Sequence, residues 1–122
     1  MEINLEEIVE KAILSKIGIG GNDGINDMVG KYCIVRTYSA GVFFGKIKKK
    51  VGKEVIINEC RRLYYWKTNG GISLSEVSKT GLDSDNSKVC SATDNHWCEA
   101  IELMACTDEA VKSIQGIKDY VN

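Results

Sequence analysis

The chain has 122 residues, of which 43% are hydrophobic and 27% charged, which suits one globular domain and leaves no room for a second independent core. Its 16 basic and 17 acidic residues almost cancel, which argues against a protein that covers DNA with a broad positive face. The chain has no run of about 18 apolar residues and no secretion signal at its start, so we expect a cytoplasmic protein with neither DNA nor a membrane as partner.

Five cysteines are spread along the chain without a CxxC pair. An odd, widely spaced set is more typical of reduced thiols than of a disulfide framework. A partial metal site can be imagined at Cys90, His96 and Cys98, but the spacing is irregular and a fourth ligand is missing. We therefore expect no metal and no cofactor.

The chain is predicted to be a single domain with three parts: a helical N-terminal extension with a glycine-rich linker over residues 1–27, a β-rich core over 28–106 and a C-terminal helix over 107–122. An apolar stripe over residues 4–17 predicts the first helix, and the glycine-rich run 18–24 ends it. That run contains a GxGG fragment, but no strand precedes it and no Lys-Ser/Thr closes it, which favours a linker over a phosphate loop.

The first part of the β-rich core alternates with a period of two. Residues 31–38 and 42–47 are predicted to be two strands folded back on the small-residue corner Ser39-Ala40-Gly41. A hairpin turn at residues 51–53 leads into a third strand over 54–58. Both faces of the first strand are largely apolar until its end, so we expect it to be central and covered on both sides.

The densest polar and aromatic cluster is Arg61-Arg62-Leu63-Tyr64-Tyr65-Trp66, whose last residues belong to a further predicted strand over 63–67. Alternation along a strand turns the two arginines to opposite faces, so they cannot serve the same side. We expect one to be structural, paired with Glu59 or Glu54, and the other to be free for a ligand or a partner subunit.

The second half of the chain has weaker signals. The region from residue 72 to 78 fits either an alternating strand or a short helix that Ser73 caps in a Ser-x-x-Glu capping box, and we favour the helix. We expect a polar surface excursion over 80–93 and a last strand over 100–103. Thr107 then caps a terminal helix, interrupted by Gly116, whose apolar stripe is Ala110, Ile114, Ile117 and Val121.

No motif for catalysis stands out: the chain has no GxSxG, no HExxH and no recognisable pair of catalytic carboxylates. We therefore expect a binding protein and not an enzyme. Guanidinium forks suit phosphate, and aromatic faces stack on a base. The aromatic cluster is equally well explained as strand packing, with Phe43, Phe44 and Tyr38 as cross-strand partners. Binding is favoured because the run 36–41, with its hydroxyls and glycine corner, occurs together with the two arginines.

The run GKYCIVRTYSAGVFFG over residues 30–45, with RRLYYW at 61–66, resembles small phage-encoded Thoeris anti-defence proteins, which share the pattern GKYxIVRTYSAGVxFG and RRLWYW. The likeness covers residues 28–77 and, more loosely, 99–110. Tyr64 stands where the pattern has Trp, which keeps a large ring but changes its stacking area.

Members of that family are viral sponges that bind and sequester cyclic ADP-ribose isomers made by host TIR-domain enzymes. They assemble into dimers and higher oligomers, and some hold cyclic oligonucleotides at separate sites. The resemblance therefore implies a nucleotide-binding Thoeris inhibitor in the host bacterial cytosol that acts by sequestration. Its implied partners are a cyclic ADP-ribose-type nucleotide, cyclic di- or trinucleotides, and further copies of the chain with pockets at the interfaces.

We predict an α+β fold, a small antiparallel β-sheet or partial barrel flanked by an N-terminal and a C-terminal helix, in an oligomer. The guanidiniums are expected to hold the pyrophosphate, the corner to give backbone and hydroxyl contacts, and an aromatic ring to stack on the base. The predicted ligand-binding residues are Arg36, Thr37, Tyr38, Ser39, Ala40, Gly41, Phe44, Arg61, Arg62, Tyr64 and Trp66. The alternatives are a phage-encoded oligomeric interaction protein whose arginines form buried ion pairs, and an enzyme that degrades a cyclic nucleotide signal.

Overall fold

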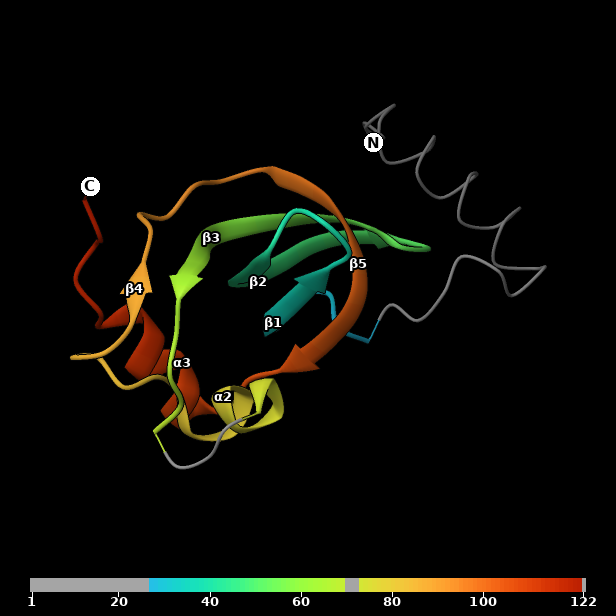
Figure 1. Cartoon of the computed structure of the whole chain (residues 1–122). Helices are drawn as coiled ribbons and strands as arrows, with labels where there is room; N and C mark the ends of the chain where they lie inside the picture. The colour runs from blue at the N-terminus through green and yellow to red at the C-terminus, as the bar shows by residue number, and fades with distance from the viewer. Residues whose placement is uncertain (1–26, 70–72, 122) are drawn as a thin grey trace, which may run out of the picture.

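The computed structural model describes residues 27–69 and 73–121, which form five strands and two helices (Figure 1). This confirms the α+β class and the antiparallel sheet. The helix and linker predicted over residues 4–24 lie outside the described residues. In chain order the elements are β1 (Tyr32–Thr37), β2 (Val42–Val51), β3 (Glu54–Tyr65), α2 (Leu74–Thr80), β4 (Lys88–Val89), β5 (His96–Ala105) and α3 (Asp108–Gln115).

Four of the strands close into a ring. β1 pairs with β2 and β5, and β3 pairs with the same two strands, in every case antiparallel. The strand β5 is strongly curved and wraps around the others, so that its first residues pair with β3 and its last with β1 (Figure 1). β4 adds to the second half of β3, outside the ring. The sheet is therefore a small barrel whose interior is narrow enough for side chains to fill.

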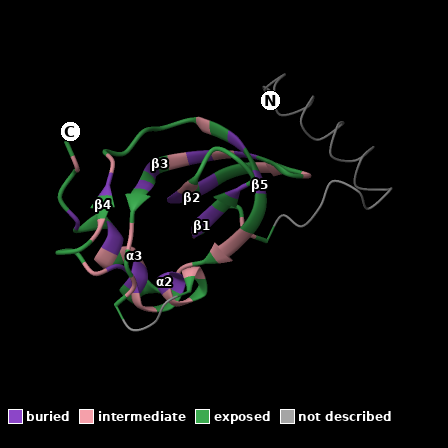
Figure 2. Cartoon of the chain, in the orientation of Figure 1, coloured by how far each residue is buried: buried purple, intermediate pink, exposed green. Residues whose placement is uncertain are grey.

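Two hydrophobic clusters lie on the two sides of the barrel wall, and Figure 2 shows their buried residues along β1, β2 and the helices. Adjacent residues of β1 enter opposite clusters, Val35 the inner one and Ile34 the outer one, which confirms that this strand is covered on both faces. The inner cluster contains Cys33, Val35, Phe43, Ile47, Val55, Ile57, Cys60, Cys98 and Ala100. The outer cluster, which includes residues of the two helices, contains Ile34, Phe44, Leu63, Val77, Leu82, Val89, Ile114 and Ile117.

The two strands predicted over 54–58 and 63–67 are one continuous strand, β3, which corrects the prediction. Glu59 has a φ of 52°, and the register with β2 shifts there, so β3 contains one extra residue. Such a bulge reverses the alternation of every side chain that follows. Ile57 and Cys60 therefore both enter the inner cluster although they are three residues apart.

Gly45 of β2 lies opposite this bulge and lets the two strands approach closely. A Cβ atom at this position would meet the side chain of Ile57, and would stand 2.9 Å from the carbonyl oxygen of Asn58 and 3.0 Å from Cα of Cys60. Only a residue without a side chain fits there. The glycine at the end of the GKYCIVRTYSAGVFFG run thus has a packing role.

The two described helices begin as the capping patterns predict. The hydroxyl of Ser73 accepts a hydrogen bond from the backbone N–H of Glu76, which confirms the helical alternative for α2. Thr107 accepts from the N–H of Ala110 in the same way at the start of α3. The prediction of a longer terminal helix was wrong, because α3 ends at Gly116 and leaves Val121 84% exposed. No helix among the described residues is long and apolar enough to cross a membrane.

The surface excursion predicted over 80–93 contains the short strand β4. Val89 in this strand is fully buried in the outer cluster and pairs with Leu63 of β3. The rest of the segment is largely exposed and polar, as expected. The last strand is longer than predicted, because β5 begins at His96 and not at Ala100.

Candidate functional site

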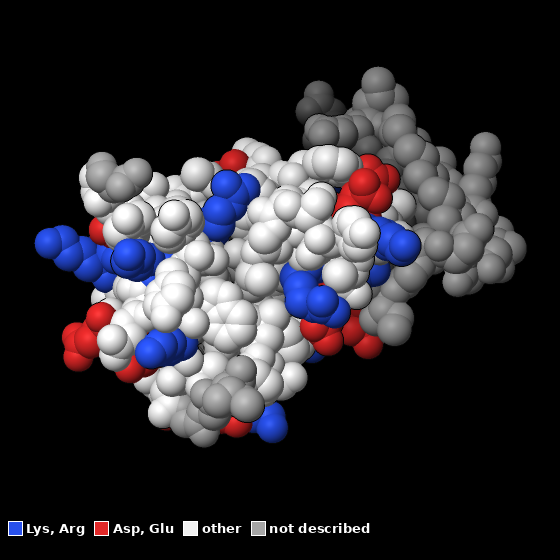
Figure 3. All heavy atoms as spheres, in the orientation of Figure 1, with Lys and Arg blue, Asp and Glu red and all other residues white. Residues whose placement is uncertain are grey.

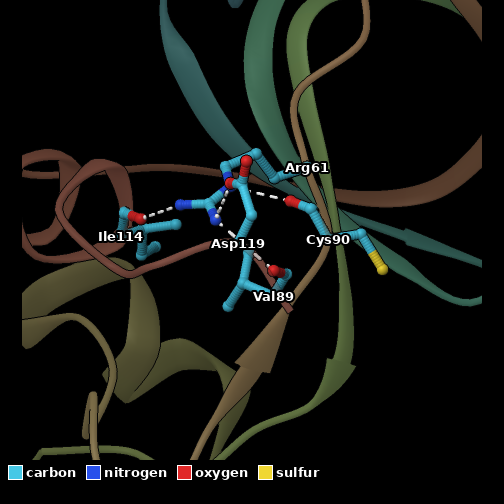
Figure 4. A network of polar contacts seen from close by, with 5 residues as sticks. All are labelled: Arg61, Val89, Cys90, Ile114 and Asp119. Atoms are coloured by element: carbon cyan, nitrogen blue, oxygen red, sulfur yellow. Dashed lines mark hydrogen bonds and ion pairs between the residues drawn. The ribbon is translucent and has the colours of Figure 1, made fainter. Parts of the chain in front are cut away.

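The first arginine of the pair, Arg61, lies in the protein interior and is 5% exposed. Its Nε donates to the carbonyl of Cys90 at 2.9 Å and its Nη1 to the carbonyl of Ile114 at 2.6 Å. Its Nη2 donates to Asp119 at 2.9 Å and to the carbonyl of Val89 at 3.4 Å (Figure 4). This guanidinium joins β3 to β4, to the end of α3 and to the segment after it, so four of its five N–H donors are committed within a buried environment.

This arrangement corrects two predictions about Arg61. It is the structural arginine of the pair, and it lines neither of the two hollows described below, although it was among the predicted ligand-binding residues. Its carboxylate partner is Asp119, whereas Glu59 accepts a hydrogen bond from the hydroxyl of Tyr32 and Glu54 accepts one from Trp97. The sequence distance of 58 residues between Arg61 and Asp119 explains why the strand pattern did not identify the partner.

The second arginine, Arg62, faces the opposite side of β3 and is exposed. It lies across from Phe43 of β2, with its guanidinium carbon 4.9 Å from the centre of that ring, an attractive cation–π geometry. Within the described residues it forms no ion pair with a carboxylate. The prediction that one arginine is structural and the other free therefore holds, with Arg62 as the free one.

Arg62 lines two hollows of the surface. The larger, with a volume of about 620 Å³, lies beside the corner between β1 and β2 and is lined by Thr37, Tyr38, Ser39, Ala40, Lys53, Arg62, His96, Trp97, Cys98, Glu99 and Ile101. The smaller, of about 230 Å³, is lined by Phe43, Cys60, Arg62, Cys90, Ser91, Thr93 and His96. We call the larger hollow the corner cavity and the smaller one the inner hollow. Arg62 and His96 line both.

The corner is held in shape by its own hydrogen bonds. The hydroxyl of Thr37 donates to the carbonyl of Gly41 at 2.7 Å and accepts from the N–H of Ala40 at 3.0 Å. Gly41 has a φ of 108°, a conformation that favours glycine. The predicted hydroxyl contact from Thr37 is thus committed within the loop. Tyr38 is 91% exposed, and it lines the cavity together with Thr37, Ser39 and Ala40 of the corner.

Besides Arg61 and Gly41, four predicted binding residues do not line the corner cavity. Arg36 forms an ion pair with Glu102 at 2.9 Å, and both side chains are nearly half exposed. Phe44 is 1% exposed and stacks on Tyr32, so it belongs to the outer cluster. The other two lie elsewhere on the structure: Tyr64 stacks on Tyr120, and Trp66 packs against the outer cluster.

Three further residues line the cavity that were not among the predicted binding residues, namely Lys53, His96 and Trp97. Trp97 is 53% exposed and its indole N–H donates to Glu54 at 3.1 Å, so the ring is oriented and still accessible. His96 and Trp97 were not predicted because the last strand was expected to begin at Ala100, whereas β5 begins at His96. Cys98 and Ala100 alternate with exposed neighbours, and extending that alternation backward would have placed His96 and Trp97 on β5.

The charge of the corner cavity is positive by a small margin. Lys53 and Arg62 carry positive charge, and Glu99 is the carboxylate among the described lining residues. Burial lowers the pKa of His96, and the positive charge of Arg62 lowers it further, so the imidazole is neutral at pH 7. Elsewhere on the surface, basic and acidic side chains are interspersed, as Figure 3 shows for one face.

The buried thiols are poorly suited to nucleophilic chemistry. Burial raises the pKa of Cys33 to about 11, and the pKa values of Cys60 and Cys106 to about 12, so these groups stay protonated at neutral pH. Over residues 27–69 and 73–121, no group of three or more His, Cys, Asp or Glu side chains is placed to hold a metal ion.

Comparison with known proteins identifies a family. A family model described as a domain of unknown function (DUF6948) matches residues 30–114. This span runs from two residues before β1 nearly to the end of α3, and it includes the barrel, the corner and both hollows. No curated protein and no solved structure matches the chain.

Proposed function

The chain belongs to the family described as a domain of unknown function, DUF6948, and we propose that it is a viral anti-defence sponge that binds a cyclic ADP-ribose isomer in the corner cavity and keeps it whole. Sequestering the signal would block host TIR-dependent immunity in the bacterial cytosol. One observation carries the proposal: a guanidinium with no carboxylate partner among the described residues lies at the same cavity as the corner of the resemblance motif.

Arg62 and Lys53 are the proposed pyrophosphate ligands. A cyclic ADP-ribose carries two phosphate groups, and a guanidinium offers paired N–H donors that match phosphate oxygens. Arg62 lies on the packed ring of Phe43, which limits the motion of its charged end. A side chain already held in place loses less entropy when a ligand binds. Glu99 opposes the two cations, so the attraction must come from direct contact more than from the overall field.

Trp97 and Tyr38 are the proposed stacking partners of the base. They take the role that the sequence assigned to Phe44, Tyr64 or Trp66. Both residues line the corner cavity and are at least half exposed, so their rings are accessible to a purine. The cavity volume of about 620 Å³ is within the range of small-molecule sites.

We also propose that the chain acts as a homo-oligomer, with an N-terminal helix flanking the sheet and a second subunit completing the pocket. The support is the openness of the site: Tyr38 has 91% of its surface exposed at the rim of the cavity, and Ile101 in the lining is 45% exposed. Exposed apolar groups at the edge of a shallow site are typical of surfaces that another chain covers. Cyclic di- and trinucleotides remain further proposed ligands, on the resemblance alone.

An enzyme that cleaves a cyclic nucleotide is the second candidate, and His96 is the observation that favours it. A neutral imidazole in the corner cavity is a possible general base. The proposal of a sponge holds that this group contacts the ligand without turning it over.

Calorimetric titration with cyclic ADP-ribose and its isomers tests the proposal, followed by denaturation and analysis of the released nucleotide. We expect heat of binding and an intact ligand after long incubation. The variant Arg62→Gln should weaken binding roughly 10- to 100-fold, from the loss of a charge-assisted hydrogen bond. Arg36→Gln is the matched control and should bind normally, since Arg36 lies outside the cavity lining.

Absence of heat with every isomer would refute the sponge, and a converted nucleotide would favour the enzyme. Sedimentation at several concentrations, with and without the ligand, tests the oligomer.

A further inference from the structure

His96 lines both hollows from the start of β5. It is the first residue of β5 and pairs with Ile57 of β3 in the wall of the barrel. Its ring lies 4.7 Å from the ring of Phe43 at a tilt of 47°. It lines both the corner cavity and the inner hollow, as Arg62 does. The chain has no other histidine.

The charged and titratable groups around His96 come from every element that borders the two hollows. β3 contributes Arg62 and the thiol of Cys60, whose pKa burial raises to about 12. The turn after β2 contributes Lys53, and β5 contributes Glu99 and Cys98. The remaining two are the thiol of Cys90, in the inner hollow, and the phenol of Tyr38, in the corner cavity; β2 itself places the uncharged ring of Phe43 there.

In the free protein these surroundings keep the imidazole neutral. Burial is the larger cause of the lowered pKa of His96, and the neighbouring guanidinium of Arg62 is the second. The first cause is burial itself, and only the second, the positive charge of Arg62, can be offset by an anion in the cavity. A phosphate group bound at Arg62 would offset the field of the guanidinium and add an acceptor for an imidazolium N–H.

We propose that His96 takes up a proton from solvent when an anionic nucleotide enters the corner cavity, so that ligand binding is coupled to protonation of this one side chain. The inference rests on the proposed function and adds a ligand contact and a pH dependence to it. The proton goes to a ring nitrogen, and the resulting imidazolium donates a hydrogen bond to the ligand phosphate. His96 is thereby a binding residue that strengthens retention of the ligand, and not a base that removes a proton from it.

The sign of the pH dependence follows from linkage. The pKa of His96 is below its ordinary value in the free protein and rises in the complex. Between the two values the complex holds more protons than the free protein, so affinity increases as pH falls through this window. A single linked proton gives at most about a tenfold change in Kd per pH unit. Well above the bound-state pKa, affinity should not depend on this group.

Two measurements on the full chain test the inference. Calorimetry with cyclic ADP-ribose isomers, repeated at pH 6.5 in buffers of different ionisation enthalpy, gives the number of protons taken up on binding. We expect a fractional uptake that disappears in His96→Asn, together with a flatter dependence of Kd on pH. NMR titration of the histidine ring signals, free and bound, follows the same proton directly because the chain has one histidine.

The outcomes separate the two proposals. Binding with proton uptake and an increased His96 pKa supports both. Binding without uptake, or with uptake that persists in His96→Asn, overturns the inference and leaves the sponge intact. No binding by the unmodified protein overturns the proposed function and the inference with it. Glu99→Gln is a useful control, because removing that carboxylate should change affinity while leaving the proton uptake in place.

Discussion

Replacing Arg61 should cost the protein much of its stability while leaving the ligand contacts in place. The side chain of Arg61 is 94% buried, and that of its ion-pair partner Asp119 is 56% exposed. In Arg61→Met the aliphatic part of the side chain is kept and the donors are removed. The variant therefore isolates the hydrogen-bonding role from packing.

The expected decrease in the free energy of unfolding depends on which acceptors of Arg61 keep another hydrogen-bond donor in the variant. The carbonyl of Val89 still accepts from the N–H of Tyr120 at 2.8 Å, and that of Ile114 from the N–H of Ile117 at 3.3 Å. The carboxylate of Asp119 is 56% exposed, so water can replace the guanidinium as its hydrogen-bond donor. The carbonyl of Cys90 loses the donor that it has in the structure.

One stranded carbonyl costs about 1–3 kcal/mol, and the loss of charged donors adds to it, so we expect about 3 kcal/mol for Arg61→Met. This is at the lower end of the cost of breaking a buried ion pair, because Asp119 is half exposed.

Urea unfolding followed by circular dichroism measures this loss. With a denaturant slope of about 2 kcal/mol per molar, the midpoint should fall by roughly 1.5 M. Arg36→Gln removes an exposed ion pair and should change stability by at most about 1 kcal/mol, which makes it the matched control. If Arg61→Met and Arg36→Gln unfold at the same urea concentration, the account of Arg61 as a structural tie is wrong.

Three further predictions concern single positions. Gly45→Ala should destabilise the protein by about 1–3 kcal/mol, because a Cβ there meets Ile57 across the bulge; an unchanged melting temperature would contradict the packing argument. Thr107→Ala should cost about 1 kcal/mol through loss of the cap of α3, and Thr107→Ser should restore most of it in the same melting experiment. His96 should make the unliganded protein less stable as pH falls below 6.5, since the unfolded chain then binds a proton that the folded one resists; His96→Asn should flatten the decline measured between pH 7.5 and 5.5.

The strands, the hairpin and the helix caps could be predicted because local patterns determine them. Alternation located β1, the glycine-containing turn joined β2 to β3, and Ser73 and Thr107 marked the helix starts. Alternation also turned Arg61 and Arg62 to opposite faces, which the burial of one and the exposure of the other confirm.

The site could be predicted only in part because it is assembled from residues far apart in the sequence. The corner was identified from its own motif, whereas Lys53, His96 and Trp97 reach the cavity through the closure of the barrel by β5. The barrel closes through pairs between β3 and β5 whose residues are about 40 positions apart in the sequence, and no local pattern encodes such pairs. The burial of Phe44 in the outer cluster was not predicted for a related reason, since an aromatic residue on a strand looks the same in sequence whether it faces a ligand or the helices.

The bulge at Glu59 changes which face each later side chain of β3 points to. If β3 were a regular strand that still contained Glu59, Arg61 would face the barrel interior and Arg62 would face the helices, and both would lose their present contacts. A chain that lacked Glu59 altogether would have a regular strand with each guanidinium still on its present side. The single extra residue in β3 therefore decides which of the two adjacent arginines stabilises the fold and which is accessible to a ligand.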